Sequence, residues 1–145
     1  MHVSAVAILR DAPDVSGGRE VLTVRKQGTE LYQYPGGKPE QGESPRDAAV
    51  REIAEETGLT VDMQALTEIG SFSAVAANEP DTTVVADLFA FAVTGDLGEP
   101  VVAAEIAEAA WLPLGTTSAT PDDPAHPLAP LMFETFPRVA ARCPQ

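Results

Sequence analysis

The run GGKPEQGESPRDAAVREIAEETGL, residues 36–59, limits what this 145-residue chain can fold into more than any other part of it. It opens with glycines and continues into a stretch with helix signals at both ends. Ser44 is a good N-cap, Pro45 suits the first helical position, and Gly58 suits the position after the last turn. These signals predict a helix over residues 45–57.

Three acids of this predicted helix, Glu52, Glu55 and Glu56, gather on one face, because a helix turns by about 100° per residue. A separate apolar stripe is expected from Val50, Ile53, Ala54 and Thr57. Like charges at this spacing repel by roughly a few tenths of a kcal/mol per pair, so a purely structural helix would gain by replacing one of them. A solvated acidic face is the simpler interpretation. A divalent cation reverses the repulsion, since Mg²⁺ takes carboxylate oxygens together with substrate phosphates.

The longer string favours the metal site, because it resembles the Nudix box. Gly37, Glu43 and the run Arg51–Leu59 match every fixed position of that motif. The resemblance implies an α/β chain, namely a Nudix-type α/β/α sandwich with a mixed β-sheet, in a single domain over residues 1–145. It also implies hydrolysis of a nucleoside diphosphate linked to a further group, with Mg²⁺ or Mn²⁺ as cofactor.

The resemblance carries over to individual metal ligands. Glu52, Glu55 and Glu56 stand where the family has its metal-binding glutamates, and the backbone carbonyl of Gly36 is implied as a further ligand.

Other positions of the box imply supporting roles. Arg51 and Glu43 resemble the pair that orients the helix and the loop, next to the fixed Gly37, and Arg51 is counted with the catalytic group. Lys38 resembles the basic residue that lies near the diphosphate. Arg25 precedes the glycines and is expected, with its neighbour Lys26, at the mouth of the cleft.

A general base is needed, because metal ions lower the pKa of a bound water while a carboxylate accepts its proton. Glu52 is the first candidate. The second is Glu105, whose spacing to Trp111 is similar to that of a loop glutamate in the MutT-like branch; Glu108 competes with it, and Trp111 is expected in the core or along the cleft.

The string LTVRKQGTELYQYPGGKPEQGES resembles MutT-like nucleoside triphosphate pyrophosphohydrolases, which implies release of pyrophosphate and a nucleoside monophosphate. His126 occupies the place of that branch's base-reading asparagine, so contact with the base and simple exposure both stay open for it. The alternatives are a pyrophosphatase for ADP-ribose or a nucleotide sugar, although Pro80 comes too late after the box for the ADP-ribose pattern. A nucleotide-binding sensor without catalysis is the third interpretation.

The net charge of −13 argues against a nucleic-acid polymer or an anionic membrane as partner, since both favour basic surfaces. The expected partner is a small nucleotide, and family members often form homodimers. The single cysteine, Cys143, excludes an internal disulfide, and no apolar run approaches the length of a membrane span. We therefore expect a cytoplasmic protein.

Apolar runs and turn signals predict the other elements. Strands are expected at residues 3–10, 19–26, 31–34, 68–76, 83–93 and 111–114. A long loop is expected over residues 115–127, followed by a terminal helix over residues 128–142 that is interrupted or kinked near Pro137.

Overall fold

The computed structural model describes residues 1–12, 18–76, 79–95, 97–114 and 127–142. Within these residues a mixed, seven-stranded sheet follows the path β3-β2-β1-β6-β5, with β4 paired to β1 and β7 paired to β2. In chain order the elements are β1 (His2–Asp11), β2 (Arg19–Lys26), β3 (Tyr32–Gln33), β4 (Gly36–Gly37), α1 (Pro45–Thr57), η1 (Met63–Ala65), β5 (Thr67–Ala76), β6 (Glu79–Ala92), β7 (Ile106–Pro113) and α2 (Pro130–Arg142).

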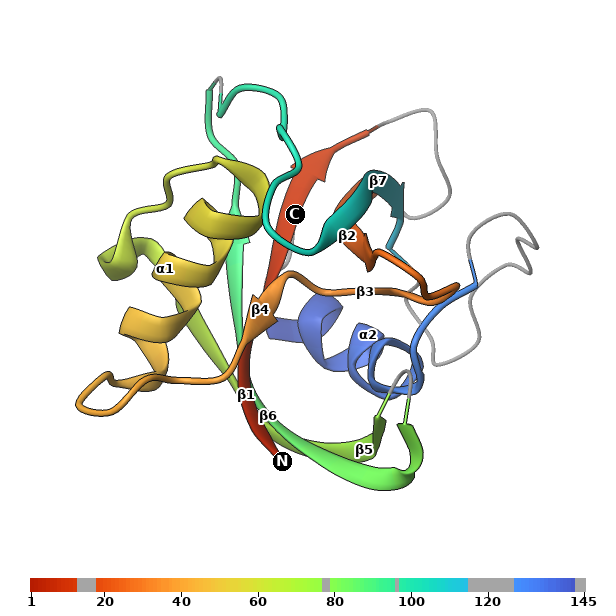
Figure 1. Cartoon of the computed structure of the whole chain (residues 1–145). Coiled ribbons are helices and arrows are strands. Elements are labelled where there is room, and N and C mark those ends of the chain that lie inside the picture. Colours follow the sequence, from red (N-terminus) through yellow and green to blue (C-terminus); the bar gives the residue numbers. More distant parts are fainter. Residues whose placement is uncertain (13–17, 77–78, 96, 115–126, 143–145) are drawn as a thin grey trace.

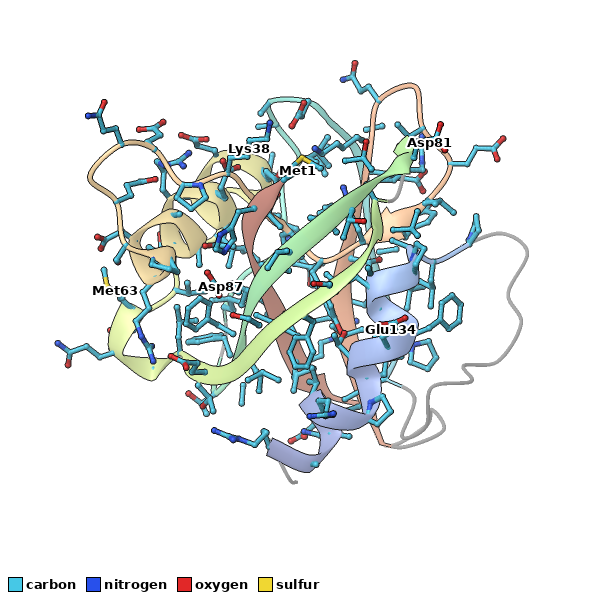
Figure 2. The ribbon with its side chains drawn as sticks, turned by 90° about the horizontal axis from the view of Figure 1, so that it is seen from below. Met1, Lys38, Met63, Asp81, Asp87 and Glu134 are labelled. Carbon is cyan, nitrogen blue, oxygen red and sulfur yellow. The ribbon has the colours of Figure 1, made fainter. Side chains whose placement is uncertain are left out.

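The sheet lies between α1 and α2, as Figures 1 and 2 show from two directions. Residues of β1 alternate between the two sides: Ala5, Ala7 and Leu9 pack in the core that includes α2, whereas Val6 and Ile8 pack in the core that includes α1. This alternation follows from the two-residue period of a strand that is buried on both faces. The predicted α/β/α sandwich with a mixed sheet is confirmed.

β1 is the central strand, and along one of its edges it pairs first with β4 and then with β2. This change of partner makes room for the functional site. On one side it runs parallel to β6 along most of its length. On the other side it pairs with β4 at Ser4 and Ala5, and with β2 only from Leu9 onward. The glycine turn and α1 therefore enter the fold beside the amino-terminal half of β1.

Helix α1 has the predicted bounds, but a different face of it is buried. The side chain of Ser44 accepts a hydrogen bond from the amide of Asp47 in a capping box, and Gly58 ends the helix in a left-handed conformation with φ 71°. Ala54, expected in the apolar stripe, is exposed, whereas Glu56 is buried. The expected separation of acid and core is therefore wrong at these two residues, because the buried face includes one glutamate.

The strand predictions differ from the structure most at β7. Only residues 111–114 were expected there, but β7 begins at Ile106 and pairs with β2 along its length. Its first half, Ile-Ala-Glu-Ala, has weak strand propensity because of its alanines and glutamate, and pairing with the buried β2 overrides that preference. β6 also begins earlier than expected, at Glu79.

The carboxy-terminal helix begins at Pro130 rather than residue 128 and contains Pro137. Thr135 Oγ1 lies 2.8 Å from the hydroxyl oxygen of Tyr34 and 2.8 Å from the carbonyl oxygen of Leu131. This buried contact ties α2 to the segment before the glycine turn. Among the described residues, no helix is both long enough and apolar enough to cross a membrane.

Candidate active site

A cleft of about 460 Å³ opens at the amino-terminal end of β1. Its charged lining residues are Lys26, Lys38, Glu40, Arg51, Glu52 and Glu105. Its apolar lining residues are Met1, Val3, Ala5, Val75, Ala76, Val84, Ala129, Leu131 and Met132. In Figure 2 the side chains of Met1 and Lys38 lie at the same end of the molecule, above the amino-terminal half of β1. The cleft thus combines charged and apolar side chains in its lining.

The glycine turn fits closely against β1. A Cβ atom on Gly36 would lie 2.1 Å from the carbonyl oxygen of Ser4 and 2.8 Å from Cα of Ala5. No side chain is compatible with that approach unless β1 itself moves. The second glycine, Gly37, meets the helix instead, because its Cβ would lie 2.5 Å from Cδ of Glu52. The two glycines therefore allow the turn to lie between β1 and the glutamate face of α1.

Arg51 donates hydrogen bonds to several glutamates beside the cleft and holds them in place. Its Nε and Nη2 atoms donate hydrogen bonds of 2.7 and 2.9 Å to the two oxygens of Glu43, in a bidentate pair. Its Nη1 atom donates to Glu52 at 3.0 Å and to Glu55 at 3.1 Å. Nη2 also donates to the carbonyl oxygen of Lys38. These contacts hold α1 to the loop that follows the glycines, and they raise the pKa of Arg51.

Burial controls the charge of two glutamates. It raises the pKa of Glu56 to about 7, with repulsion from Glu52 as a further cause, while a 3.0 Å hydrogen bond from the amide of Gly36 acts in the opposite direction. Burial also raises the pKa of Glu52, against the effect of Arg51. The negative charge of Glu105 raises both values. The positive charges and hydrogen bonds around Glu52 and Glu56 are therefore too few to offset the cost of burying their negative charges.

That imbalance fits a divalent cation. Glu52, Glu55 and Glu56 offer the hard oxygen atoms that Mg²⁺ and Mn²⁺ prefer, and a bound cation would offset the repulsion that raises the pKa of Glu52 and Glu56. Among the described residues, no three Asp, Glu, His or Cys side chains already converge as a ready-made metal cluster. Arg51, which bonds two of the three glutamates, supplies positive charge there.

Glu105 and Glu108, the two candidates for a later base, have different surroundings. Glu105 lies in the turn directly before β7 and lines the cleft with Glu52. Glu108 lies within β7 and accepts a 2.8 Å hydrogen bond from Nη2 of Arg25. Geometry therefore brings Glu105, and not Glu108, to the side of the cleft where Glu52 lies.

The basic residues show a similar division. Arg25 donates to Glu108 and to the carbonyl oxygen of Thr29, and it is not among the residues that line the cleft. Its neighbour Lys26 does line the cleft, with Lys38. Successive strand residues point to opposite faces, so only one of the pair could do so, and the sequence pattern gave no preference between them. His126 lies outside the described residues.

Trp111 packs away from this site. It contacts the core that includes α1, and the guanidinium carbon of Arg10 lies 4.1 Å from the centre of its ring. Tyr34 is the aromatic residue of the described cleft lining, and it is buried.

A glycine turn followed by a glutamate-bearing helix, on a mixed sheet between two helices, defines a Nudix-type domain. The family model for the NUDIX domain matches residues 1–135. The chain therefore belongs to the Nudix family. A Bacillus subtilis (strain 168) protein, provisionally named an 8-oxo-dGTP diphosphatase, is 43% identical over 47 residues, which are 32% of each chain. The match thus spans about a third of that relative.

Solved structures share the fold. A MutT/nudix family protein from Enterococcus faecalis has a TM-score of 0.78 at 20% identity, over 97% of this chain and 61% of that one. A MutT NUDIX hydrolase from Burkholderia pseudomallei has a TM-score of 0.68 at 23% identity, over 95% and 96% of the two chains. The NUDIX domain of Shewanella oneidensis NrtR, solved with ADP ribose, has a TM-score of 0.73 at 16% identity, over 98% and 87%.

Proposed function

We propose that this protein is a Mg²⁺- or Mn²⁺-dependent hydrolase that cleaves a nucleoside triphosphate between its α and β phosphates, releasing pyrophosphate and the monophosphate. The observation that carries the proposal is that Glu52, Arg51, Lys26 and Lys38 line a single cleft. Carboxylates that bind a cation and ammonium groups that bind phosphate oxygens are both needed at a polyphosphate.

The glutamates Glu52, Glu55 and Glu56 would hold the cation, with the Gly36 carbonyl as a further ligand. When bound, the cation supplies charge neutralisation and a lower pKa for a coordinated water. Glu52 or Glu105 would accept the proton of the attacking water, since both carboxylates line the cleft.

Among the residues that the structure describes, three side chains supply positive charge to the cleft, and their tasks differ. Arg51 donates hydrogen bonds to Glu43, Glu52 and Glu55, so we assign it the task of fixing Glu52 and Glu55 in place. Lys38 is exposed and would bind the outer phosphates. Lys26 joins Lys38 in this role, in place of Arg25, whose guanidinium is held by Glu108.

The apolar side chains of the cleft would receive the nucleoside. Ligand sites are commonly apolar with a few placed polar groups, and here Gln33 also lines the cleft. Its amide offers donors and an acceptor to the edge of a base. The partial match to the relative provisionally named an 8-oxo-dGTP diphosphatase makes a purine triphosphate the first substrate to test.

The test is a product assay over nucleoside triphosphates, including 8-oxo-dGTP, with ADP-ribose, nucleotide sugars and dinucleoside polyphosphates in the same panel. We expect pyrophosphate from a triphosphate in the presence of Mg²⁺ or Mn²⁺, and a loss of about a hundredfold or more in kcat for Glu52→Gln. Preference for ADP-ribose, the ligand of the NrtR domain, would transfer the assignment to a pyrophosphatase of that class. Nucleotide binding without any turnover would instead identify a sensor.

A further inference from the structure

Lys26 and Glu105 form an ion pair in the lining of the cleft. Nζ of Lys26 lies 3.3 Å from Oε1 of Glu105, and the two side chains are 36% and 65% exposed. Both line the cleft together with Glu52. An ion pair with this much exposure is weak, so a more highly charged anion can displace the carboxylate.

The backbone around Glu105 is irregular on both sides. Ala104 has φ 57°, and among the residues that the structure describes it is the only non-glycine residue with a positive φ. After Glu105, the register of β2 against β7 shifts: Arg25 faces Glu108, but Lys26 faces Ile106. A left-handed alanine and a bulge each carry a cost, and bulges next to active sites often redirect a side chain.

A hydrogen bond fixes the same turn to β2. The amide of Gln27 donates to the carbonyl oxygen of Glu105 at 2.8 Å. The backbone of Glu105 is therefore held next to Lys26, while its exposed carboxylate can still rotate. Among the described contacts, the ion pair with Lys26 is therefore the one that fixes the direction of the Glu105 carboxylate.

The other cations of the cleft lack this link. Arg51 is already paired with Glu40, Glu43, Glu52 and Glu55, and Lys38 has no described ion pair with Glu105. Lys26 also lies close enough to Glu56 to lower its pKa, whereas Glu105 raises it. Lys26 thus interacts with an acid of α1 as well as with Glu105.

We propose that Lys26 is a positioning residue that holds the Glu105 carboxylate in the free protein and releases it when a substrate polyphosphate takes over the Lys26 ammonium. The proposal rests on the proposed function, because it assigns Lys26 to the phosphates of that substrate. Once released, the Glu105 carboxylate is free to turn toward Glu52 and the attacking water. A ligand that does not reach Lys26 leaves Glu105 tethered.

The exchange predicts a binding signature that needs no catalysis. A polyphosphate must displace Glu105 from Lys26, so Glu105→Gln should bind it more tightly than the parent does. The gain should require Lys26. We expect inorganic tripolyphosphate, titrated by calorimetry with Mg²⁺, to bind about threefold more tightly to Glu105→Gln and about tenfold more weakly to Lys26→Met. In the double variant the threefold gain should disappear.

Two matched variants separate this coupling from general electrostatics. In the Lys38→Met background, Glu105→Gln should still give its threefold gain, because Lys38 is not paired with Glu105. Glu108→Gln removes a nearby charge that is paired with Arg25, and it should leave binding unchanged. A gain from Glu105→Gln that survives in Lys26→Met would overturn the proposal, as would absence of tripolyphosphate binding to the parent.

Turnover provides the second readout and separates the two proposals. With the best triphosphate of the panel, Lys26→Met should raise KM while kcat stays within about twofold, because Glu105 is untethered both in this variant and in the substrate-saturated parent. A loss of kcat of about tenfold or more in Lys26→Met would refute the release step while leaving the hydrolase assignment intact. Coupled tripolyphosphate binding in a protein that hydrolyses nothing would do the reverse.

Discussion

The backbone amide of Gly36 donates a 3.0 Å hydrogen bond to Oε1 of Glu56, a residue with only 2% of its surface exposed. Burial, with the charge of Glu52 as a further cause, raises the pKa of this carboxyl group from 4.5 to about 7. Between these values the folded protein keeps a proton that the unfolded chain has released. The stability of the metal-free protein should therefore fall as the pH rises through this interval.

Glu56→Gln should remove that dependence, because the amide stays neutral and its oxygen can still accept the Gly36 hydrogen bond. In the presence of EDTA we expect its Tm to exceed that of the parent by about 4 °C or more at pH 8, and to match it at pH 4. Thermal unfolding over this pH range measures both. Glu134→Gln, on the exposed side of α2, is the control and should follow the parent. Parallel curves for Glu56→Gln and the parent would refute the prediction.

The two glycines of the turn should respond differently to alanine. In Gly37→Ala the new Cβ would meet the end of the Glu52 side chain, which can rotate away, so the fold should survive while kcat falls about tenfold or more. In Gly36→Ala it would meet the backbone of Ser4 and Ala5, which cannot yield without disturbing β1. We expect Gly36→Ala to lose several °C of Tm or to become insoluble. Equal Tm losses in the two variants would contradict this distinction.

Much of this architecture was predictable from local sequence chemistry. The bounds of α1 follow from Ser44, Pro45 and Gly58, and those of β2 from its apolar run. The buried state of Glu56 was not predictable, because helix periodicity places residues around an axis but does not say which side meets the sheet. That choice depends on the Gly36 amide, which is distant in sequence and close in space.

The same limit applies to the cleft. Strand periodicity separates Arg25 from Lys26, but only the pairing of β2 with β7 shows that Lys26 faces the site. Glu105 was recognised from its spacing to Trp111, although Trp111 itself packs elsewhere. Contacts between distant segments decide which of these side chains reach the cleft. The sequence therefore predicts which charged residues belong to the site better than it predicts how they are arranged.

Arg51→Lys tests the guanidinium network. A lysine ammonium cannot reproduce a bidentate pair with Glu43 together with bonds to Glu52 and Glu55. We expect kcat to fall about tenfold or more, with substrate binding less affected. Arg46→Lys is the control, since Arg46 donates to the carbonyl oxygens of Met63 and Leu66 outside the cleft. Retention of full kcat by Arg51→Lys would show that charge alone suffices.

Addition of a divalent cation provides the last test. A cation that binds only the folded state adds about 2.7 kcal/mol of stability at a hundred times its Kd, so Mg²⁺ or Mn²⁺ should raise Tm by several degrees, and EDTA should reverse the effect. Because the chain carries a net charge of −13, ionic strength must be matched with NaCl to separate binding from screening. The shift should shrink in Glu52→Gln, Glu55→Gln and Glu56→Gln and persist in Glu134→Gln. A shift of equal size in all four variants would place the cation elsewhere on the acidic surface, and the proposed ligands would then be wrong.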